Sequence, residues 1–354
     1  MESAQDIKLT QFSHGAGCGC KIAPSVLQEI LIGSKTRQTA LSGQTGGLLI
    51  GNESGDDAAV YELPNGDCLI STTDFFMPIV DDAYDFGRIA ATNALSDVYA
   101  MGGKPILALA ILGFPIEKLP VEIAQNILRG GKSICDAANI PLAGGHSIDS
   151  PEPLFGMAVN GLVNKKNIKR NNTAREGDLI FLTKPIGTGI LSTALKRKLI
   201  TEEALQPAVE VMCQLNSIGE LFGSLGYVHA MTDVTGFGLI GHLLEMCEGS
   251  DLSAEIFYSK IKLIEGVEAL AKKFVAPDST FRNWKSYEPK VSGIGGESLV
   301  TLCDPQTSGG LMVAVASKNE SEFRMLLKEN SRWDFSEPIG IFKIKSEKVI
   351  SVLP

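Results

Sequence analysis

Four aspartates in this sequence each follow an apolar or threonine-containing stretch: Asp57, Asp74, Asp97 and Asp233. Burying an unpaired carboxylate in such surroundings is costly, so each needs a partner or a special position. Carboxylates at the ends of elements can converge on one cleft and hold a hard cation such as Mg²⁺. The cation would neutralise the phosphates of ATP and polarise the phosphoryl group being transferred. Any one aspartate would also suit a cap or turn, but the shared pattern favours a metal-dependent phosphate site.

A glycine-rich segment near the N-terminus forms a second constellation, Gly15-Ala16-Gly17-Cys18-Gly19-Cys20-Lys21. Glycines let a backbone fold closely over phosphates, and a nearby lysine lowers the pKa of a thiol and balances phosphate charge. A Cys18 thiolate could act as a nucleophile, a metal ligand or a handle for a soft substrate. A flexible arm with incidental cysteines also fits this composition. A zinc site is disfavoured, because no second closely spaced cysteine pair supplies the remaining ligands.

Two phosphate-binding patterns compete with this interpretation. Gly131-Lys132-Ser133 resembles the end of a Walker loop, but Asn126 stands where its first glycine should be, which excludes the loop. The run Gly236 to Gly241 does match the dinucleotide-binding pattern GxGxxG, and Glu255 lies near the offset expected for ribose binding. Against this, Asp233 would repel a pyrophosphate there unless a metal intervened. A dinucleotide-binding oxidoreductase and a thiol-rich metal-binding protein therefore remain as alternatives.

Bulk composition narrows the class of protein. The chain has 354 residues, which suits two domains of ordinary size. Its formal charge is −9 and it has no basic cluster, which argues against binding to nucleic acid. The longest apolar runs, such as Ile106 to Phe114, fall short of the ~20 residues that span a bilayer. No signal peptide is visible at the start, and the seven cysteines form no disulfide pattern. We therefore expect a cytoplasmic protein with reduced thiols and no membrane contact.

Periodicity and turn residues predict regular alternation of strands and helices after a polar arm. Strands are expected over residues 47–51, 58–63, 68–73, 106–114, 154–163, 178–183, 298–303 and 311–316. Helices are expected over residues 85–101, 121–138, 190–198, 203–225 and 239–247, with a loop over 231–238. An asparagine-rich break over 164–177 separates two blocks. We therefore predict a mobile arm over 1–46, a first α/β domain over 47–164 and a second α/β domain over 176–354.

Six motifs together closely resemble the selenophosphate synthetases, and they cover nearly the whole chain. They begin at His14, Ser71, Ala90, Ala143, Thr232 and Cys303, and read HGAGCGCK, STTDFF, AATNALSD, AGGHS, TDVTGFG and CDPQTSGG. The resemblance implies an α/β (α+β) fold of two domains, shared with aminoimidazole ribonucleotide synthetases, and a homodimer. The domain over 47–164 would bind ATP and Mg²⁺ and form the dimer contact. It also implies a kinase that converts ATP, selenide and water to selenophosphate, AMP and orthophosphate, with Mg²⁺ and a stimulating K⁺. Its product would be the selenium donor for selenoproteins and seleno-tRNA.

The resemblance further implies a role for individual residues, carried over by motif. The catalytic residues would be Cys18 and Lys21, and the magnesium ligands Asp57, Asp97 and Asp233. The positions that bind nucleotide would be Lys21, Ser54, Gly55, Asp56, Asp74, Asp97, Gly145, His146 and Ser147. We expect the segment from Gln11 to Gly47 to be mobile without ligand and to become ordered over bound nucleotide. The polar loop over 303–310 receives no role from spacing alone.

Overall fold

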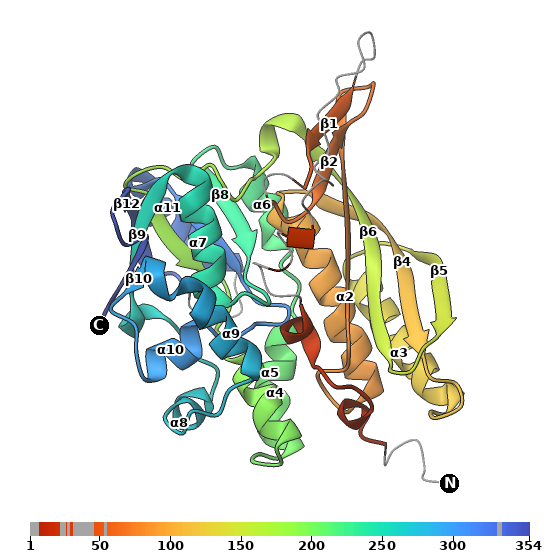
Figure 1. Cartoon of the computed structure of the whole chain (residues 1–354). Helices are drawn as coiled ribbons and strands as arrows, with labels where there is room; N and C mark the ends of the chain where they lie inside the picture. The colour runs from red at the N-terminus through yellow and green to blue at the C-terminus, as the bar shows by residue number, and fades with distance from the viewer. Residues whose placement is uncertain (1–6, 22–25, 27–28, 31–45, 53–54, 331–334) are drawn as a thin grey trace.

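The computed structural model describes residues 7–21, 26, 29–30, 46–52, 55–330 and 335–354, and Figure 1 shows their arrangement. Two sheets lie side by side, each with helices of its own. The chain passes from the first sheet to the second between Asn164 and Leu179. Of the predicted arm over 1–46, only residues 7–21, 26, 29–30 and 46 belong to the described chain.

The first sheet contains six strands in the order β1-β2-β3-β6-β4-β5. Their bounds are β1 (Gly47–Ile50), β2 (Ala59–Glu62), β3 (Asp67–Phe76), β4 (Lys104–Phe114), β5 (Leu142–Asp149) and β6 (Leu154–Asn164). Only β4 and β5 pair in parallel, and the crossover between them is α3 (Val121–Ala137). The other helix, α2 (Ala83–Ala100), begins at Asp82, whose carboxylate accepts from the Asp85 N–H at 2.7 Å. β5 is therefore an edge strand with one open side.

Close packing of α2 on α3 depends on two glycines. A Cβ on Gly87 would lie 1.9 Å from the Ile127 carbonyl oxygen, and one on Gly130 would lie 2.0 Å from the Tyr84 carbonyl oxygen. The two helix backbones can therefore approach only because neither residue has a side chain. The pair covers one face of the first sheet (Figure 1).

The second sheet contains seven strands in the order β10-β13-β9-β12-β7-β11-β8. Their bounds are β7 (Leu179–Leu182), β8 (Val228–Asp233), β9 (Leu252–Phe257), β10 (Val291–Ser292), β11 (Leu311–Val315), β12 (Gly340–Ile344) and β13 (Ile350–Leu353). All of β11 is buried, which explains its unbroken apolar sequence. The helices of this half are α4 (Thr188–Lys196), α5 (Glu202–Met212), α6 (Ile218–Ser224), α7 (Gly238–Ser250), α8 (Val267–Ala271), α9 (Asp278–Tyr287), α10 (Glu297–Leu302) and α11 (Glu320–Asn330).

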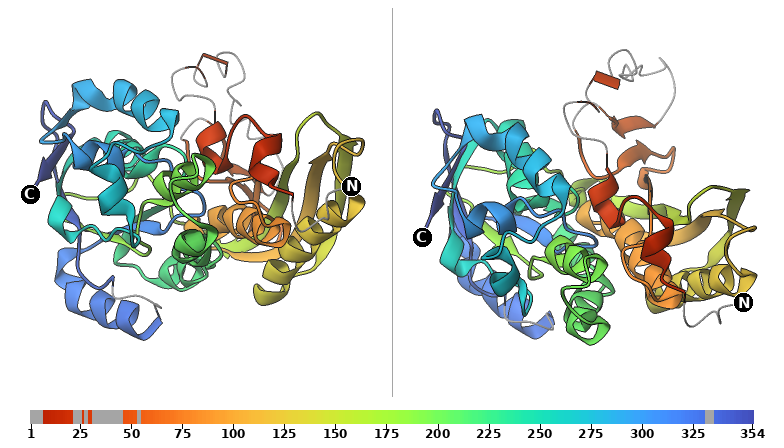
Figure 2. Two further views of the ribbon diagram at one scale, coloured as in Figure 1. Left: turned by 90° about the horizontal axis from the view of Figure 1, so that it is seen from below. Right: turned by 60° about the horizontal axis from the view of Figure 1, so that its bottom comes forward.

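α2 lies between the two halves and contacts both, so it is buried on nearly every side. It packs on β3 and β6 of its own sheet and on β8, α5 and α6 of the other half. Across this junction lie the short 3₁₀ turns η1 (Leu9–Phe12) and η2 (Gly17–Cys20), red in Figure 2. Thr10 anchors η1, since its N–H and hydroxyl both donate to Asp81, at 3.0 and 2.6 Å.

Three expected elements were wrong. The helix expected over 203–225 is two helices, α5 and α6, because the chain breaks at residues 213–217. The break places the Asn216 amide where it donates to Ser96 Oγ and to the Gly309 carbonyl, both at 2.8 Å. The segment expected as a strand over 298–303 is helical in α10, since a short apolar run does not distinguish the two. The loop expected over 231–238 begins as the end of β8, whose polar residues pair with β11.

No helix in the described part of the chain is both long and apolar enough to cross a membrane.

Candidate active site

The Cys18 side chain is buried at the junction of the two halves, with 1 % of its surface exposed. Its N–H donates to Thr307 Oγ1 at 3.0 Å, and its thiol donates to Asn93 Oδ1 at 3.3 Å. Gly17 has φ +50°, and a Cβ there would lie 2.4 Å from Thr307 Oγ1 and 2.5 Å from Ile79 Cδ1. A side chain at position 17 would therefore clash with Thr307 and Ile79 and displace η2, which explains why a glycine precedes the cysteine.

Asn93, on α2, links Cys18 to the two charged residues predicted beside it. Its Oδ1 also accepts from the Ser308 N–H at 2.8 Å, and its Nδ2 donates to Asp74 Oδ2 at 2.6 Å. The same Asp74 oxygen lies 3.5 Å from Lys21 Nζ. The structure thus brings together Cys18, Lys21 and Asp74, and it adds an asparagine to which the sequence analysis had assigned no role.

The surroundings of Cys18 and Lys21 favour the protonated form of both side chains. Burial raises the pKa of the Cys18 thiol, the Asp74 carboxylate raises it further, and Lys21 offsets only part of this. Burial would lower the pKa of Lys21, but the Asp74 carboxylate and other neighbouring acids raise it overall. The Lys21 side chain is still 40 % exposed, so water screens these interactions. In this arrangement the residues are a neutral thiol and a charged ammonium.

The three predicted magnesium ligands lie close enough to repel one another. Asp57 and Asp97 come from the first half, and Asp233 ends β8 in the second. Burial raises the pKa of Asp57 and of Asp97, and in each case the Asp233 carboxylate raises it further. Burial likewise raises the pKa of Asp233. Buried carboxylates that disfavour one another's charge are typical of a site that binds a cation.

Threonine hydroxyls satisfy only part of this cluster. Thr232 Oγ1 donates to Asp57 Oδ1 at 2.8 Å, and Thr72 Oγ1 donates to Asp97 Oδ2 at 2.5 Å. Among the residues that the structure describes, the second oxygens of Asp57 and Asp233 are buried and have no hydrogen-bond partner. Within the described ranges, no group of three or more His, Cys, Asp or Glu side chains is arranged so that it could hold a metal ion. The free oxygens are hard donors, which suit Mg²⁺ or Ca²⁺ better than a soft metal.

The other predicted nucleotide-binding residues, apart from Lys21, Asp74 and Asp97, fall in two other places. Asp56 Oδ1 accepts from the Asn171 N–H at 3.0 Å, and the Gly55 carbonyl accepts from Asn171 Nδ2 at 2.8 Å. Ser54 lies outside the described residues. Residues 145–147 lie on the exposed edge strand β5, where they line a cavity of about 450 Å³ together with Arg129 and Lys132. β5 is the last strand of the first sheet, at the edge that Figure 1 shows farthest from the second sheet, and Cys18 does not line this cavity.

The loop over 303–310 accepts hydrogen bonds from the N-terminus of α4 and contacts the Cys18 site. Asp304 Oδ2 accepts from the Gly189 and Ile190 N–H groups at 3.1 and 3.2 Å, which caps the N-terminus of α4. Gln306 Oε1 accepts from the N–H groups of Gly187 and Thr188 at 2.9 and 3.1 Å. Fixed in this way, the loop presents its Thr307 hydroxyl to Cys18 and its Ser308 N–H to Asn93. In the sequence, this loop stood out by its polar, glycine-ended composition between apolar segments and as one of the six family motifs, but neither indicated these contacts.

Comparison with known proteins identifies the family. The model of the AIR synthase related protein N-terminal domain matches residues 55–163, and that of the C-terminal domain matches residues 175–342. A protein of Pasteurella multocida named selenide, water dikinase is 53% identical over 93% of this chain and 92% of its own. A protein of the same name from Sulfurovum is 51% identical over 98% of this chain and 99% of its own. The chain belongs to the selenide, water dikinase family.

Solved structures agree with this family in fold. The structure of AaThiL complexed with AMPPCP and TMP aligns with TM-score 0.65 and 18% identity, covering 92% of each chain. A thiamine-monophosphate kinase from Stenotrophomonas maltophilia aligns with TM-score 0.61 and 17% identity, covering 94% of this chain and 96% of that one. The predicted α/β (α+β) fold of aminoimidazole ribonucleotide synthetase type is therefore confirmed.

Membership of the selenide, water dikinase family leaves the two alternatives without support. Before the GxGxxG run, β8 pairs with β11 in antiparallel fashion, so it does not belong to the parallel βαβ unit that a dinucleotide site requires. A Cβ on Gly236 would lie 2.6 Å from the Cys18 carbonyl oxygen, so η2 occupies the space in front of these glycines. The Cys18 thiol, in turn, donates its hydrogen bond to the Asn93 side-chain amide.

Proposed function

We propose that this chain makes selenophosphate from selenide, ATP and water, with release of AMP and orthophosphate. The observation that carries the proposal is the identity of 51% to 53% with proteins named selenide, water dikinase over nearly the full length of both chains. The site supports it, because a buried thiol, a lysine and a carboxylate cluster meet at one junction. AaThiL, which has the same fold, was solved in complex with the ATP analogue AMPPCP, and this agrees with ATP as a substrate.

Cys18 and Lys21 are the proposed catalytic residues. Selenide is soft, and sulfur is the side-chain atom best suited to handle it. Lys21 supplies a charged ammonium beside Cys18, where it would pair with a phosphate oxygen. Thiolate formation needs a change in this structure, since burial and the Asp74 carboxylate raise the pKa of Cys18. An incoming anion that drew Lys21 away from Asp74 would alter this balance.

Asp57, Asp97 and Asp233 are the proposed magnesium ligands. The two buried oxygens without hydrogen-bond partners fit such an ion, because they are hard donors that the protein leaves unsatisfied. When bound, Mg²⁺ would neutralise negative charge on the phosphates of ATP. Thr72 and Thr232 hold two of the carboxylates in place through the other oxygen. The stimulation by K⁺ implied by the resemblance stays a prediction.

A homodimer would bring the remaining nucleotide-binding positions into use. The face of the first sheet turned away from α2 and α3 exposes large apolar side chains, among them Phe75 (50 %) and Leu109 (37 %). Residues 145–147 lie beside this face on an open edge strand. Packing of two such faces would bury the apolar side chains and carry β5 of one copy toward the junction of the other. We expect sedimentation velocity to show a dimer at micromolar concentration, and a monomer there would contradict the arrangement.

Product analysis tests the function directly. The purified chain is incubated with ATP, Mg²⁺ and selenide, and the products are followed by chromatography and ³¹P NMR. We expect AMP together with a phosphorus signal split by bonding to selenium. In Cys18→Ser this signal should disappear while ATP still binds, whereas Cys20→Ser should cost much less. Full activity of Cys18→Ser would remove Cys18 from the mechanism, and ATP turnover without a selenium-bonded product would contradict the function.

A further inference from the structure

A cavity of about 350 Å³ lies against the segment that carries Cys18, yet Cys18 does not line it. Its walls are residues 14–16 and Gly19 of this segment, the last turns of α4 and the start of α9. The Cys18 thiol points to Asn93 on α2, and none of the three clustered aspartates belongs to the lining. The cavity is therefore a different site from the one described above.

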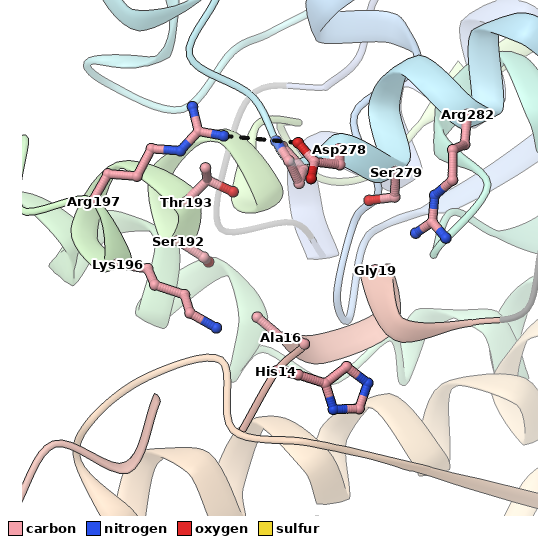
Figure 3. A pocket seen from close by; sticks show the side chains of 12 residues that line it. His14, Ala16, Gly19, Ser192, Thr193, Lys196, Arg197, Asp278, Ser279 and Arg282 are labelled. Carbon is pink, nitrogen blue, oxygen red and sulfur yellow. Dashed lines mark ion pairs between the residues drawn. The ribbon is translucent and has the colours of Figure 1, made fainter. Parts of the chain in front are cut away.

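The lining of this cavity carries an excess of positive charge. Figure 3 shows Lys196 and Arg282 extending toward it from opposite walls, α4 and α9. A third cation, Arg197, has its Nη2 4.0 Å from Asp278, a fully exposed carboxylate. Neither Lys196 nor Arg282 forms an ion pair with any residue that the structure describes. In a chain of net charge −9, two cations left without carboxylates in one hollow indicate an anionic partner.

Polar groups around these cations are also available. Lys196 Nζ donates one hydrogen bond, to the Ser13 carbonyl at 3.1 Å, which leaves two of its protons for a ligand. The Ser279 side chain, on the first turn of α9, is 8 % exposed and borders the cavity beside Gly19. Water takes about 30 Å³, so the volume admits a small ion with several waters but not an ordered macromolecular segment.

We propose that this cavity binds a small inorganic anion, of the class that includes hydrogen selenide and orthophosphate. The inference rests on the proposed function for the choice between these two ions, but the binding itself does not depend on it. Ala16 and Gly19, which line the cavity, flank Cys18 in the sequence. An anion bound there is separated from the Cys18 thiol by the backbone of the segment that carries it. The cavity could therefore hold the anionic substrate before reaction or the phosphate product after it.

Binding is tested with orthophosphate as the probe. The full chain is first saturated with Mg²⁺ and a non-hydrolysable ATP analogue, so that the nucleotide site is filled, and phosphate is then titrated by calorimetry. Arg282→Gln and Lys196→Gln should each weaken phosphate binding by about three- to tenfold, because each removes one charged donor. Lys285→Gln is the matched control, since it removes an exposed cation from α9 that does not line the cavity. No phosphate binding to the unaltered chain, or equal weakening in Arg282→Gln and Lys285→Gln, would overturn the proposal.

Kinetics then identify the ion. If the cavity serves hydrogen selenide, Arg282→Gln raises the KM for selenide about three- to tenfold and leaves the KM for ATP unchanged. If it serves the phosphate product, the same variant raises the inhibition constant of orthophosphate and leaves the KM for selenide unchanged. Unchanged values of both constants would contradict a role for the cavity in turnover, whereas the calorimetric titration alone decides whether the anion binds. Failure of the proposed function would appear separately, as absence of selenophosphate in every variant while the calorimetric result stands.

Discussion

Asn93 and Thr307 define the position of Cys18 more than any feature of the glycine-rich segment itself. Asn93 receives the thiol and the Ser308 N–H on one oxygen and donates to Asp74 through its nitrogen. Thr307 accepts from the Cys18 N–H. One residue belongs to α2 and the other to the loop over 303–310, so the cysteine is held by both halves of the molecule.

Thr307→Val should lower turnover about tenfold or more while the KM for ATP changes little. Valine keeps the shape of threonine but leaves the buried Cys18 N–H without an acceptor, at a cost of about 1–3 kcal/mol. Thr307→Ser keeps the hydroxyl and should retain most of the turnover. Steady-state assays of both variants check this, and equal losses in the two would show that the hydroxyl does not position Cys18.

Among the elements, the loop over 303–310 and α4 act as a unit. Buried Asp304 and Gln306 supply the acceptors that the first turn of α4 needs, and Lys184 Nζ donates to the Ser308 carbonyl at 2.8 Å. Burial raises the pKa of Asp304 to about 8, although hydrogen bonds from Gln306 and from the Ile190 and Gly189 N–H groups lower it in part. The loop therefore contains a carboxyl group that titrates near neutral pH.

Asp304→Asn should become relatively more stable as the pH rises. A carboxyl whose pKa is raised in the folded state contributes stability fully below its unfolded pKa of ~4, and loses it as the pH rises through its folded pKa. The uncharged amide has no such loss. The free energy of unfolding of the original chain minus that of the variant should fall between pH 5 and 8, by at most about 1.4 kcal/mol per pH unit, and level off above pH 8.

Urea denaturation from pH 5 to 9 measures this difference for Asp304→Asn. Asp149→Asn, an exposed carboxylate on β5, is the control and should give a difference that changes little with pH. A flat profile for Asp304→Asn as well would mean that Asp304 keeps an ordinary pKa in the folded chain.

At the scale of the whole molecule, three buried carboxyl groups lie at the junction of the two halves, where charge on them is unfavourable. Asp57 and Asp97 from one half meet Asp233 from the other, and each has a raised pKa because of burial and, for the first two, the Asp233 carboxylate. A ligand that binds only the folded state stabilises it by mass action. A cation at this junction should therefore hold the two halves together.

Mg²⁺ should stabilise the unaltered chain by about 2.7 kcal/mol at a hundred times its Kd. Asp233→Asn should raise the Tm without Mg²⁺, because it removes a repelling charge, and should abolish the rise with Mg²⁺. Thermal unfolding with and without Mg²⁺ checks both effects, with Asp149→Asn as a matched control that should respond like the original chain. An Asp233→Asn variant that still gained stability from Mg²⁺ would place the ion elsewhere.

Many of the strands and helices, and the kind of chemistry at the site, could be predicted from the sequence, because local residue chemistry determines them. The apolar run over residues 311–316 was predicted as a strand and forms β11, and the helix predicted to end at residue 101 ends just before Gly102, whose positive φ suits a helix C-terminus. The aspartates that end apolar stretches pointed to metal chemistry, because a buried carboxylate is costly without a partner, and the glycine-rich segment pointed to phosphate, because glycines let the backbone approach it closely. The family motifs then supplied selenium, which no spacing indicates.

Long-range packing decided the rest. Cys18 and Thr307 are 289 residues apart, and Thr232 and Asp57 are 175 apart, so no local pattern predicts their hydrogen bonds. The short run at residues 298–303 was misassigned because its periodicity fits both states, and burial against neighbours made it helical. Residues 145–147 looked like part of the same site in the sequence, yet strand order placed them at an outer edge. Strand order and domain packing depend on contacts between distant segments, and these exist only in the folded chain.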